Sequence, residues 1–429
     1  MNKSLRALAA LAFFLVSVSP LAAQTQKNQE PARNWPVEFR DVLQKNILQF
    51  WIDHATDNEY GGMVGWLGRE GDPIPPGTKS LVQQTRVVWT FSAAYERYPD
   101  PVYGEVATHT LKFLRERMWD KGHGGFNWLV DRKGKVVDDK KHLYGESFAL
   151  YALAEYSRAF QDPAAKREAL ELFRLIDQKA HDNTNGGYFE AFDADWSHQI
   201  KNQLAMNLAN RKSMNTHIHL LESFTTLYQV TQDPAIRKRV EELLNLCLNK
   251  IVDPQKGYLR LYFTNDWKPA ENFETSSYGH DIELSWLITE SAEALGRTTD
   301  AQVKAVALAL VDHTLRDGFD DQQGGVYNEG PAQGPAKDKV KVWWVEAESL
   351  VGLLNAYQLT GKQIYRDRFD QQANYVLLRF VDRQFGDWFN EIQPDGMITG
   401  DKTNEWKDPY HQSRACMEVI QRLESLGKK

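Results

Sequence analysis

The sequence predicts an all-α fold, an (α/α)6 barrel of six inner and six outer helices joined by short glycine-turn hairpins. Three observations lead to this prediction. One motif recurs along the whole chain, two helical patterns lie between its copies, and a join containing Asp and Pro recurs between the two helices of a pair. An open helical solenoid is the alternative. We find no polar capping repeat, which favours a closed ring because closure buries the terminal faces.

The recurring motif is an acidic or polar cluster followed by one or two glycines and an aromatic or apolar run. Glycine permits the positive φ of a tight turn, and the alternating run after it predicts a short hairpin. Successive glycine turns lie roughly 60–70 residues apart, a period typical of repeat architectures. The six copies occupy residues 57–66, 120–130, 182–192, 253–263, 321–328 and 383–392.

Two helical patterns fill each interval between the turns. One is apolar almost all round, as in residues 146–159, which predicts an inner helix buried on every side. The other is apolar on one face only, which predicts an amphipathic outer helix. Its clearest example steps by three and four through Tyr103, Ala107, Leu111, Leu114 and Met118. The joins between the two helices, at 98–101, 161–164 and 232–235, offer Asp as an N-cap and Pro as the first helical residue.

The N-terminus predicts a cleaved export signal over residues 1–23. Lys3 and Arg6 supply the positive region, residues 7–18 the apolar stretch, and Leu21-Ala22-Ala23 the small-residue cleavage site. The apolar stretch is too short to span a membrane, which takes about 20 residues. We therefore expect a periplasmic or secreted protein with no membrane contact after cleavage. Residues 24–33 are expected to form a disordered linker, and residues 34–429 a single catalytic domain.

Charge and cysteine content narrow the function classes. Removal of the two basic residues of the signal takes the formal net charge from −7 to −9, which argues against nucleic acid and anionic membranes as partners. Cys247 and Cys416 are expected to be buried thiols rather than a disulfide. No glycine-rich phosphate loop is visible, so we expect no bound nucleotide. The protein is expected to be a monomer.

Uncommon polar and aromatic residues recur where each inner helix should begin. Inner helices related by the repeat run parallel, so their N-termini share one rim of a barrel, and helix N-termini favour a developing anion. These residues, far apart in sequence, are therefore expected to converge on one opening. They are Arg86, Tyr144, Glu146, Asn215, His217, His219, His280, Asp281, Glu283, Trp343, Trp344, Glu346, Glu348, Trp406 and His411.

The segments that carry these residues resemble those of cellobiose 2-epimerases, in the N-acylglucosamine 2-epimerase superfamily. The resemblance covers roughly residues 35–425, all six repeats. Two positions depart from the family pattern: Glu146 stands where Gln is expected, and Asn127 where an aromatic residue is expected. The matching segments are QQTR, YGESF, NTHIHLLE, SYGHDIELSW, WWVEAE and PYHQSRACME.

The resemblance implies a reaction: reversible epimerisation at C2 of the reducing-end sugar of β-1,4-linked disaccharides such as cellobiose, lactose or mannobiose, without cofactor or metal. The ring opens, C2 loses its proton to give a cis-enediolate, and a proton returns to the opposite face. His280 and His411 are the predicted acid–base pair, because imidazole exists in both protonation states near neutrality. His219 is expected to contact the reacting sugar and assist ring opening.

The remaining predicted site residues support these three histidines. Glu283, three residues after His280, is expected to hold that imidazole in one tautomer. Arg86 is expected to clamp sugar oxygens and the enediolate charge. Sugar contacts are predicted for Asn215, Trp343, Glu346, Trp406 and Tyr144. His217, which points away from His219, is expected to be a packed core histidine.

Four alternatives remain open at this stage. An aldose–ketose isomerase of the same superfamily would deliver the proton to C1 instead of C2. A barrel glycoside hydrolase would need two flanking carboxylates, for which Glu283 and Glu346 are candidates. A non-catalytic glycan-binding protein could use the tryptophans alone. A metal site would draw on the four histidines of this set and Glu283, although His-x-His spacing is weak evidence for one.

Overall fold

The computed structural model describes residues 33–197, 211–270 and 275–428. Residues Trp35–Lys429 form one compact unit. The predicted signal peptide (1–23), and all of the predicted linker (24–33) but its last residue, lie outside the described residues. In the described part of the chain, no helix combines the length and apolar character needed to cross a membrane.

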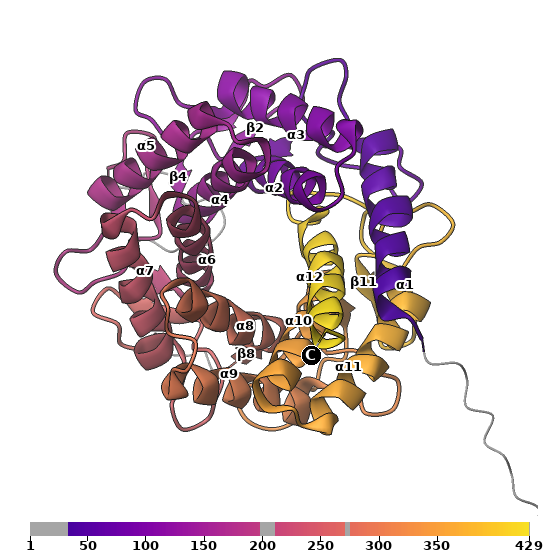
Figure 1. Ribbon diagram of the computed structural model, residues 1–429. Helices are drawn as coiled ribbons and strands as arrows, with labels where there is room; N and C mark the ends of the chain where they lie inside the picture. Colours follow the sequence, from indigo (N-terminus) through magenta and orange to yellow (C-terminus); the bar gives the residue numbers. More distant parts are fainter. Residues whose placement is uncertain (1–32, 198–210, 271–274, 429) are drawn as a thin grey trace, which may run out of the picture. The chain divides into compact units, whose positions relative to one another are not determined.

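Six helices form an inner ring and a second ring of helices surrounds it (Figure 1). The ring closes where α12 packs against α2, which confirms the closed barrel over an open solenoid. The inner helices are α2 (Leu81–Arg97), α4 (Leu143–Phe160), α6 (Met214–Thr231), α8 (Tyr278–Ala294), α10 (Trp343–Thr360) and α12 (Tyr410–Leu426).

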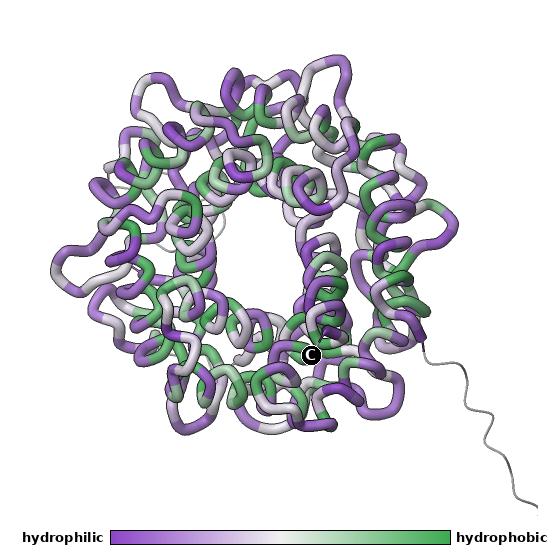
Figure 2. Tube along the Cα trace, viewed as in Figure 1, coloured by the Kyte–Doolittle hydropathy of each residue, from purple (hydrophilic) through white to green (hydrophobic). Residues whose placement is uncertain are grey.

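The outer ring is amphipathic, as the sequence predicts. In α5, one face alone is buried, whereas almost all of α6 is buried. Hydrophilic residues predominate in the loops at the circumference (Figure 2). The outer helices are α1 (Trp35–Asp41), α3 (Pro101–Phe113), α5 (Pro163–Ala180), α7 (Pro234–Leu246), α9 (Ala301–His313) and α11 (Gln363–Tyr375). All but α5 are extended by π-helical segments at Val42–Leu48 and Trp51–Ala55, Leu114–Met118, Cys247–Ile251, Thr314–Gly318 and Val376–Phe380.

The Asp-Pro joins cap the outer helices. Oδ1 of Asp162 accepts the main-chain N–H of Ala164 at 2.7 Å, and Pro163 begins α5. The same arrangement begins α3 and α7, where the aspartates are Asp100 and Asp233. The prediction that Asp would serve as N-cap and Pro as first helical residue is confirmed at these joins.

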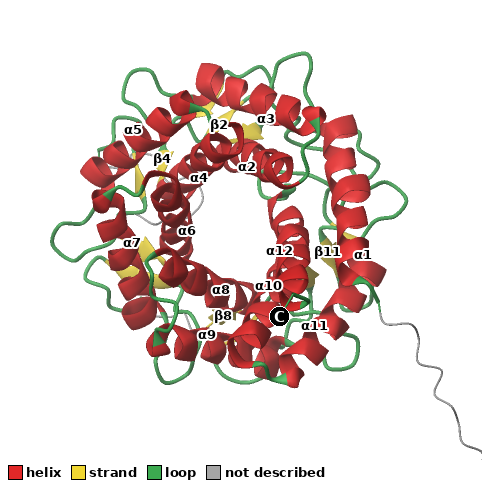
Figure 3. Cartoon of the chain, viewed as in Figure 1, coloured by secondary structure: helices red, strands yellow, loops and turns green. Residues whose placement is uncertain are grey.

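Short antiparallel strands lie in the segments that lead from an outer helix to the next inner helix (Figure 3). The strand before one inner helix pairs with the strand that follows the next glycine turn, while each turn itself closes on a single bridge such as Trp119 with Phe126. The three-stranded sheets are β1 (Lys79–Ser80), β2 (Leu129–Val130), β3 (Val136–Asp138) and β10 (Lys341–Val342), β11 (Glu391–Ile392), β12 (Ile398–Thr399). The two-stranded sheets are β4 (Lys141–His142) with β5 (Ala191–Phe192), β6 (Arg211–Ser213) with β7 (Tyr262–Thr264), and β8 (Thr275–Ser277) with β9 (Glu329–Pro331).

One repeated contact fixes how the inner helices are rotated. An acceptor in the first turn of the helix binds the main-chain N–H just after the preceding glycine turn. The turn leaves no room for a side chain: a Cβ on Gly187, whose φ is +71°, would lie 2.8 Å from Nε2 of His217. The acceptor and donor pairs are Gln84 with Met63, Glu146 with Phe126, His217 with Tyr188, Asp281 with Leu259, and Glu346 with Val326.

This contact determines which residues face the barrel axis. Helical residues two positions apart point in nearly opposite directions. Because the acceptor is turned outward to the glycine turn, the residue two positions later is turned inward. At this inward position stand Arg86, Phe148, His219, Glu283, Glu348 and, in the last repeat, Arg414.

Candidate active site

A cavity of about 240 Å³ lies among the first turns of the inner helices. All six inner helices contribute to its wall, and ten of the fifteen residues expected to converge line it. The other five do not line the cavity: Glu146, His217, Asp281, Glu346 and Glu348. Nine of the ten predicted site residues line it. The lining residues are Arg86, Tyr144, Asn215, His219, His280, Glu283, Trp343, Trp344, Trp406 and His411.

Glu346, predicted to contact sugar, does not line the cavity. Its carboxylate accepts hydrogen bonds from the main chain of Val326 at 3.1 Å and from Nε2 of Gln372 on α11 at 2.6 Å. In its repeat, Glu346 is the first-turn acceptor that binds the main chain just after the glycine turn. Its burial raises its pKa to about 7. The spacing of three from Trp343 suggests a shared face, but the glycine-turn contact rotates Glu346 toward the outer ring.

His411 is held by a carboxylate from the neighbouring helix. Nδ1 of His411 lies 2.7 Å from Oε1 of Glu348 on α10. A carboxylate only accepts, so the imidazole proton sits on Nδ1 and Nε2 is left for the cavity. Burial lowers the pKa of His411 to about 3, with Glu348 opposing the shift. The imidazole is therefore uncharged at neutral pH.

His219 has the same kind of partner on its own helix. Nδ1 of His219 lies 3.0 Å from Oε2 of Glu222, three residues later. Burial lowers the pKa of His219, and the Glu222 carboxylate opposes that shift. The ring packs 4.7 Å from that of Phe148 and 5.3 Å from that of Tyr144. Like His411, His219 presents Nε2 as an acceptor.

His280 has a hydroxyl partner instead of the predicted carboxylate. Its Nδ1 lies 2.7 Å from Oγ of Ser277, and its ring lies 4.6 Å from that of Trp344. Burial, with His219 and His411 adding to the effect, lowers the pKa of His280 to about 3. The sequence predicts that Glu283 holds this imidazole, and that prediction is wrong.

Glu283 instead binds Arg414, which lies beneath the cavity. Nη2 of Arg414 donates to Oε1 of Glu283 at 2.9 Å and to Oε1 of Glu348 at 2.8 Å. Its Nη1 contacts Glu222 and the hydroxyl of Tyr410. One buried guanidinium thus organises the carboxylates that hold His219 and His411.

The pKa values of the three carboxyl groups around Arg414 shift in different directions. Burial and the nearby charge of Glu348 raise the pKa of Glu283 well above its ordinary value. Burial also opposes ionisation of Glu348, but Arg414 and His411 outweigh it and lower the pKa to about 2. Of these carboxyl groups, Glu283 therefore has the raised pKa and Glu348 the lowered one.

Arg86 lies within the wall of the cavity. Its Nη1 donates to Oδ2 of Asp408 at 3.0 Å, its Nη2 donates to the hydroxyl of Tyr144 at 2.8 Å, and its guanidinium lies 4.1 Å from the ring centre of Phe148. Its Nε has no partner among the described residues. The ion pair with Asp408 is buried, so this arginine keeps a fixed orientation beside the histidines.

Aromatic residues form the mouth of the cavity. Trp406 is 43% exposed and lies 6.0 Å from the rings of Tyr144 and Trp128. Trp343 is buried, and neither its Nε1 nor Oδ1 of Asn215 has a partner among the described residues. Two residues of the cavity wall thus carry buried polar atoms that no described residue binds.

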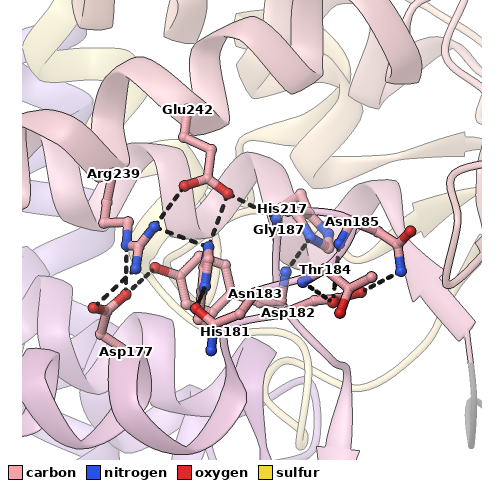
Figure 4. Close-up of polar contacts among 12 residues, drawn as sticks. Asp177, His181, Asp182, Asn183, Thr184, Asn185, Gly187, His217, Arg239 and Glu242 are labelled. Carbon is pink, nitrogen blue, oxygen red and sulfur yellow. Dashed lines mark hydrogen bonds and ion pairs between the residues drawn. The ribbon is translucent and has the colours of Figure 1, made fainter.

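His217 lies outside the cavity, in the core contact predicted for it. Its Nδ1 donates to the carbonyl of Ser213 at 2.7 Å and its Nε2 accepts the N–H of Tyr188 at 3.0 Å. Figure 4 shows this histidine beside the glycine turn, where Glu242 accepts the N–H of Gly187. Burial lowers the pKa of His217 to about 4, so it is an uncharged structural group.

One buried cluster brings metal-ligand atoms together, and it is not the set of four histidines and Glu283 that the sequence suggests. Ligand atoms of Glu283, Glu348 and His411 lie within 4.8 Å of one another. Arg414 already donates to both carboxylates, and Glu348 also holds Nδ1 of His411. A guanidinium therefore occupies the position in which a cation would neutralise these carboxylates.

Sequence reasoning missed several residues of this site. Five residues hydrogen-bond either to a residue that lines the cavity or to the carboxylate that holds a cavity histidine. They are Glu222, Ser277, Asp408, Tyr410 and Arg414. The i,i+3 spacing of His219 and Glu222 was a usable signal, because it is the spacing that drew attention to Glu283. Asp408 and Arg414 act across helices, and no local spacing indicates them.

The chain is similar to sugar epimerases and isomerases along its length. A cellobiose 2-epimerase of Bacteroides fragilis is 33% identical over 391 residues, which cover 89% of this chain and 98% of that protein. The solved cellobiose 2-epimerase of Spirochaeta thermophila has a TM-score of 0.84 and 35% identity, covering 91% of this chain and 97% of that one. A D-mannose isomerase of Marinomonas mediterranea is 25% identical over 400 residues, covering 90% of this chain and 97% of that protein.

The family model of N-acylglucosamine 2-epimerase (GlcNAc 2-epimerase) matches residues 62–415. The chain belongs to this family. It is an enzyme of the epimerase and isomerase type, which confirms the enzyme class that the sequence predicts.

Proposed function

We propose that the enzyme reversibly epimerises C2 of the reducing-end sugar of β-1,4-linked disaccharides, converting glucose to mannose at that position. The observation that carries the proposal is the trio His219, His280 and His411 around one cavity, each with a lowered pKa. Uncharged imidazoles can accept a proton from carbon at neutral pH. The similarity to cellobiose 2-epimerases supports the same reaction.

The proposed reaction begins with ring opening, in which His219 moves a proton between O5 and O1. One histidine of the His280–His411 pair then takes the C2 proton, and the electrons of the C–H bond form the cis-enediolate. Arg86 would bind that charge, and its place in the cavity wall supports this role. An anion beside an imidazole raises its pKa, so the second histidine takes a proton from solvent at this stage, and the first later releases the C2 proton to solvent. After rotation about C2–C3, the second histidine gives its proton to the opposite face.

The cavity walls favour a disaccharide over a single sugar. Trp343 and Trp344 lie beside the histidines, whereas Trp406 is exposed at the mouth. Aromatic faces pack against the C–H faces of pyranose rings. The reacting sugar would lie at the histidines and the second sugar on Trp406.

The decisive experiment is incubation with cellobiose in D2O, with chelator present and no added nucleotide. NMR should find glucosyl-mannose with deuterium at C2, because the proton returned comes from a histidine that exchanges with solvent. His280→Ala and His411→Ala should each abolish epimerisation and retain disaccharide binding. Loss of turnover on chelation, restored by one metal, would instead support the metal alternative. Two variants with near wild-type rates would mean that the pair is misassigned.

An aldose–ketose isomerase is the second candidate. The 25% identity with a D-mannose isomerase favours it, since the same enediolate gives a ketose when C1 receives the proton. In the same experiment, fructose-type products from mannose would support this alternative. The hydrolase alternative has lost its pair of carboxylates, because Glu346 faces Gln372 and not the cavity.

We also propose that the mature enzyme is exported and begins near Gln24. The support is the N-terminal pattern of a basic region, an apolar stretch and a small-residue cleavage site. N-terminal sequencing of the native protein tests the proposal. Retention of residues 1–23 on purified native protein would refute it.

A further inference from the structure

Ser277 occupies the N-cap position of α8 but does not cap the helix. Its backbone has the extended conformation of an N-cap residue, yet its side chain accepts no main-chain N–H of the first turn. Oγ of Ser277 lies 2.7 Å from Nδ1 of His280, the residue three positions later. An N-cap serine normally accepts the N–H of that third residue, so the hydroxyl has exchanged a backbone partner for a side chain.

The equivalent serines of two other repeats do cap their helices. Ser80 accepts the N–H of Gln83 before α2, and Ser213 accepts the N–H of Thr216 before α6, both at 3.1 Å. The three serines stand at the same place in the repeat, at the end of a short strand and before an inner helix. Only at Ser277 is the third residue a histidine that lines the cavity.

The partner of each cavity histidine determines which tautomers it can adopt. Glu222 and Glu348 only accept, so they fix the proton of His219 and His411 on Nδ1. A serine hydroxyl can donate or accept. Among the described residues, Oγ of Ser277 has no partner other than Nδ1 of His280. The hydroxyl can donate its proton in this contact only when Nδ1 carries no proton.

We propose that Ser277 is a positioning residue that donates to Nδ1 of His280 and so keeps the proton of the neutral ring on Nε2, facing the cavity. The resting site then holds two imidazoles that present a lone pair and one that presents an N–H. When His280 becomes an imidazolium, the hydroxyl of Ser277 turns and accepts from Nδ1. The imidazolium gives its Nε2 proton to the substrate and keeps the proton on Nδ1, so in the reverse direction the bare Nε2 takes a proton from C2.

This inference rests on the proposed function for its catalytic meaning, but its structural part is tested without activity. The mature protein is labelled with ¹⁵N-histidine, and long-range ¹H–¹⁵N spectra report the tautomer of each ring. His280→Gln assigns the His280 signals. In the wild type we expect protonated Nε2 at His280 and protonated Nδ1 at His411. Ser277→Ala should move His280 toward a mixture of tautomers and leave His411 unchanged.

Kinetics and stability separate positioning from helix capping. Ser277→Ala should lower kcat roughly 10-fold with KM within about twofold, which is the lower end of the loss seen when a metal-bound histidine loses the partner of its other ring nitrogen. Ser277→Thr keeps a hydroxyl at the position and should restore both the spectrum and kcat. The control Ser213→Ala removes a hydroxyl that caps α6 and also donates to Glu190 at 2.8 Å, so it should lower Tm more than Ser277→Ala and leave kcat and the His280 spectrum unchanged.

The inference fails if His280 already carries its proton on Nδ1 in the wild type. It also fails if Ser277→Ala leaves the His280 spectrum unaltered, or lowers Tm as far as Ser213→Ala does while kcat is unaffected. A wild-type enzyme that does not epimerise disaccharides would contradict the proposed function alone, because the spectra would still report the contact of Ser277 with His280.

Discussion

Oε1 of Glu348 lies 2.7 Å from Nδ1 of His411 and 2.8 Å from Nη2 of Arg414. A single carboxylate oxygen thus joins a cavity imidazole to the buried guanidinium beneath it. Arg414 keeps Glu348 ionised, and the ionised carboxylate orients His411 and would stabilise its charged form. The orientation of a cavity histidine therefore depends on two residues that do not line the cavity.

Glu348→Gln should lower kcat for epimerisation about 10²-fold or more, which is within the range of a general acid–base contribution. The amide no longer enforces the Nδ1 proton of His411 or compensates its charge. Glu346→Gln is the matched control, because it makes the same change two residues earlier on α10 and faces the outer ring. Steady-state kinetics with cellobiose measure both variants. Equal kcat values for the two would contradict the role given to Glu348.

Arg414→Met should destabilise the fold strongly. It leaves the buried carboxyl groups of Glu222, Glu283 and Glu348 without their common cation, and breaking a buried ion pair costs about 3–5 kcal/mol. Urea unfolding of the variant measures the loss. Adding Glu348→Gln to Arg414→Met should recover part of it, since one uncompensated charge is removed. A loss below about 1 kcal/mol would place Arg414 among the weak ion pairs.

The pH dependence of kcat/KM should lack a step near pH 6.5. Burial lowers the pKa of both His280 and His411 to about 3, so their uncharged forms persist as the pH falls from 8 to about 5. We expect a flat profile across that range and a decline only in stronger acid. Circular dichroism at each pH checks that the enzyme stays folded. A midpoint near 6.5 would indicate imidazoles of ordinary pKa.

Glu146→Gln should remove a pH-dependent cost to stability. Burial raises the pKa of Glu146 to about 8, and its Oε2 has no partner among the described residues. A raised pKa contributes stability below the unfolded value near 4.5, and that contribution is lost as the pH rises through 8. The free energy of unfolding of the variant, relative to that of the wild type, should rise by up to about 1.4 kcal/mol per pH unit across this window. Gln84, which makes the equivalent contact, shows that an amide fits there.

Thermal unfolding at pH 5 and pH 8 checks the Glu146 prediction. The difference in Tm between variant and wild type should be larger at pH 8. The same difference at both pH values would mean that Glu146 is ionised throughout or that Oε2 has a water partner.

Trp406→Ala should raise KM for cellobiose about 10-fold, because stacking against an aromatic ring contributes about 0.5–1.5 kcal/mol or somewhat more. Trp406 is exposed at the mouth and distant from the reacting carbon in the proposed reaction. KM for a monosaccharide, measured with the same variant, is the internal control and should change little. Equal effects on both substrates would place the second sugar elsewhere.

The sequence by itself determined the repeat, the barrel class and most of the cavity. These follow from local signals: glycine turns, Asp-Pro caps and the 3.6-residue period all act within a few residues. Because the inner helices are parallel copies, polar residues in their first turns had to converge on one rim. The pairing of His219 with Glu222 is also local, since an i,i+3 contact lies on one helix.

Only the tertiary structure decided which carboxylate serves which imidazole. His280 and Glu283 have the same i,i+3 spacing as His219 and Glu222, yet Glu283 turns to Arg414, which approaches from α12. A buried carboxylate pairs with the strongest hydrogen-bond donor near it, and helix packing determines which donors are near. Glu346 faces outward for a similar reason: the N–H of Val326 and Gln372 of α11 bind it there. Spacing along one helix carries no information about donors on its neighbours.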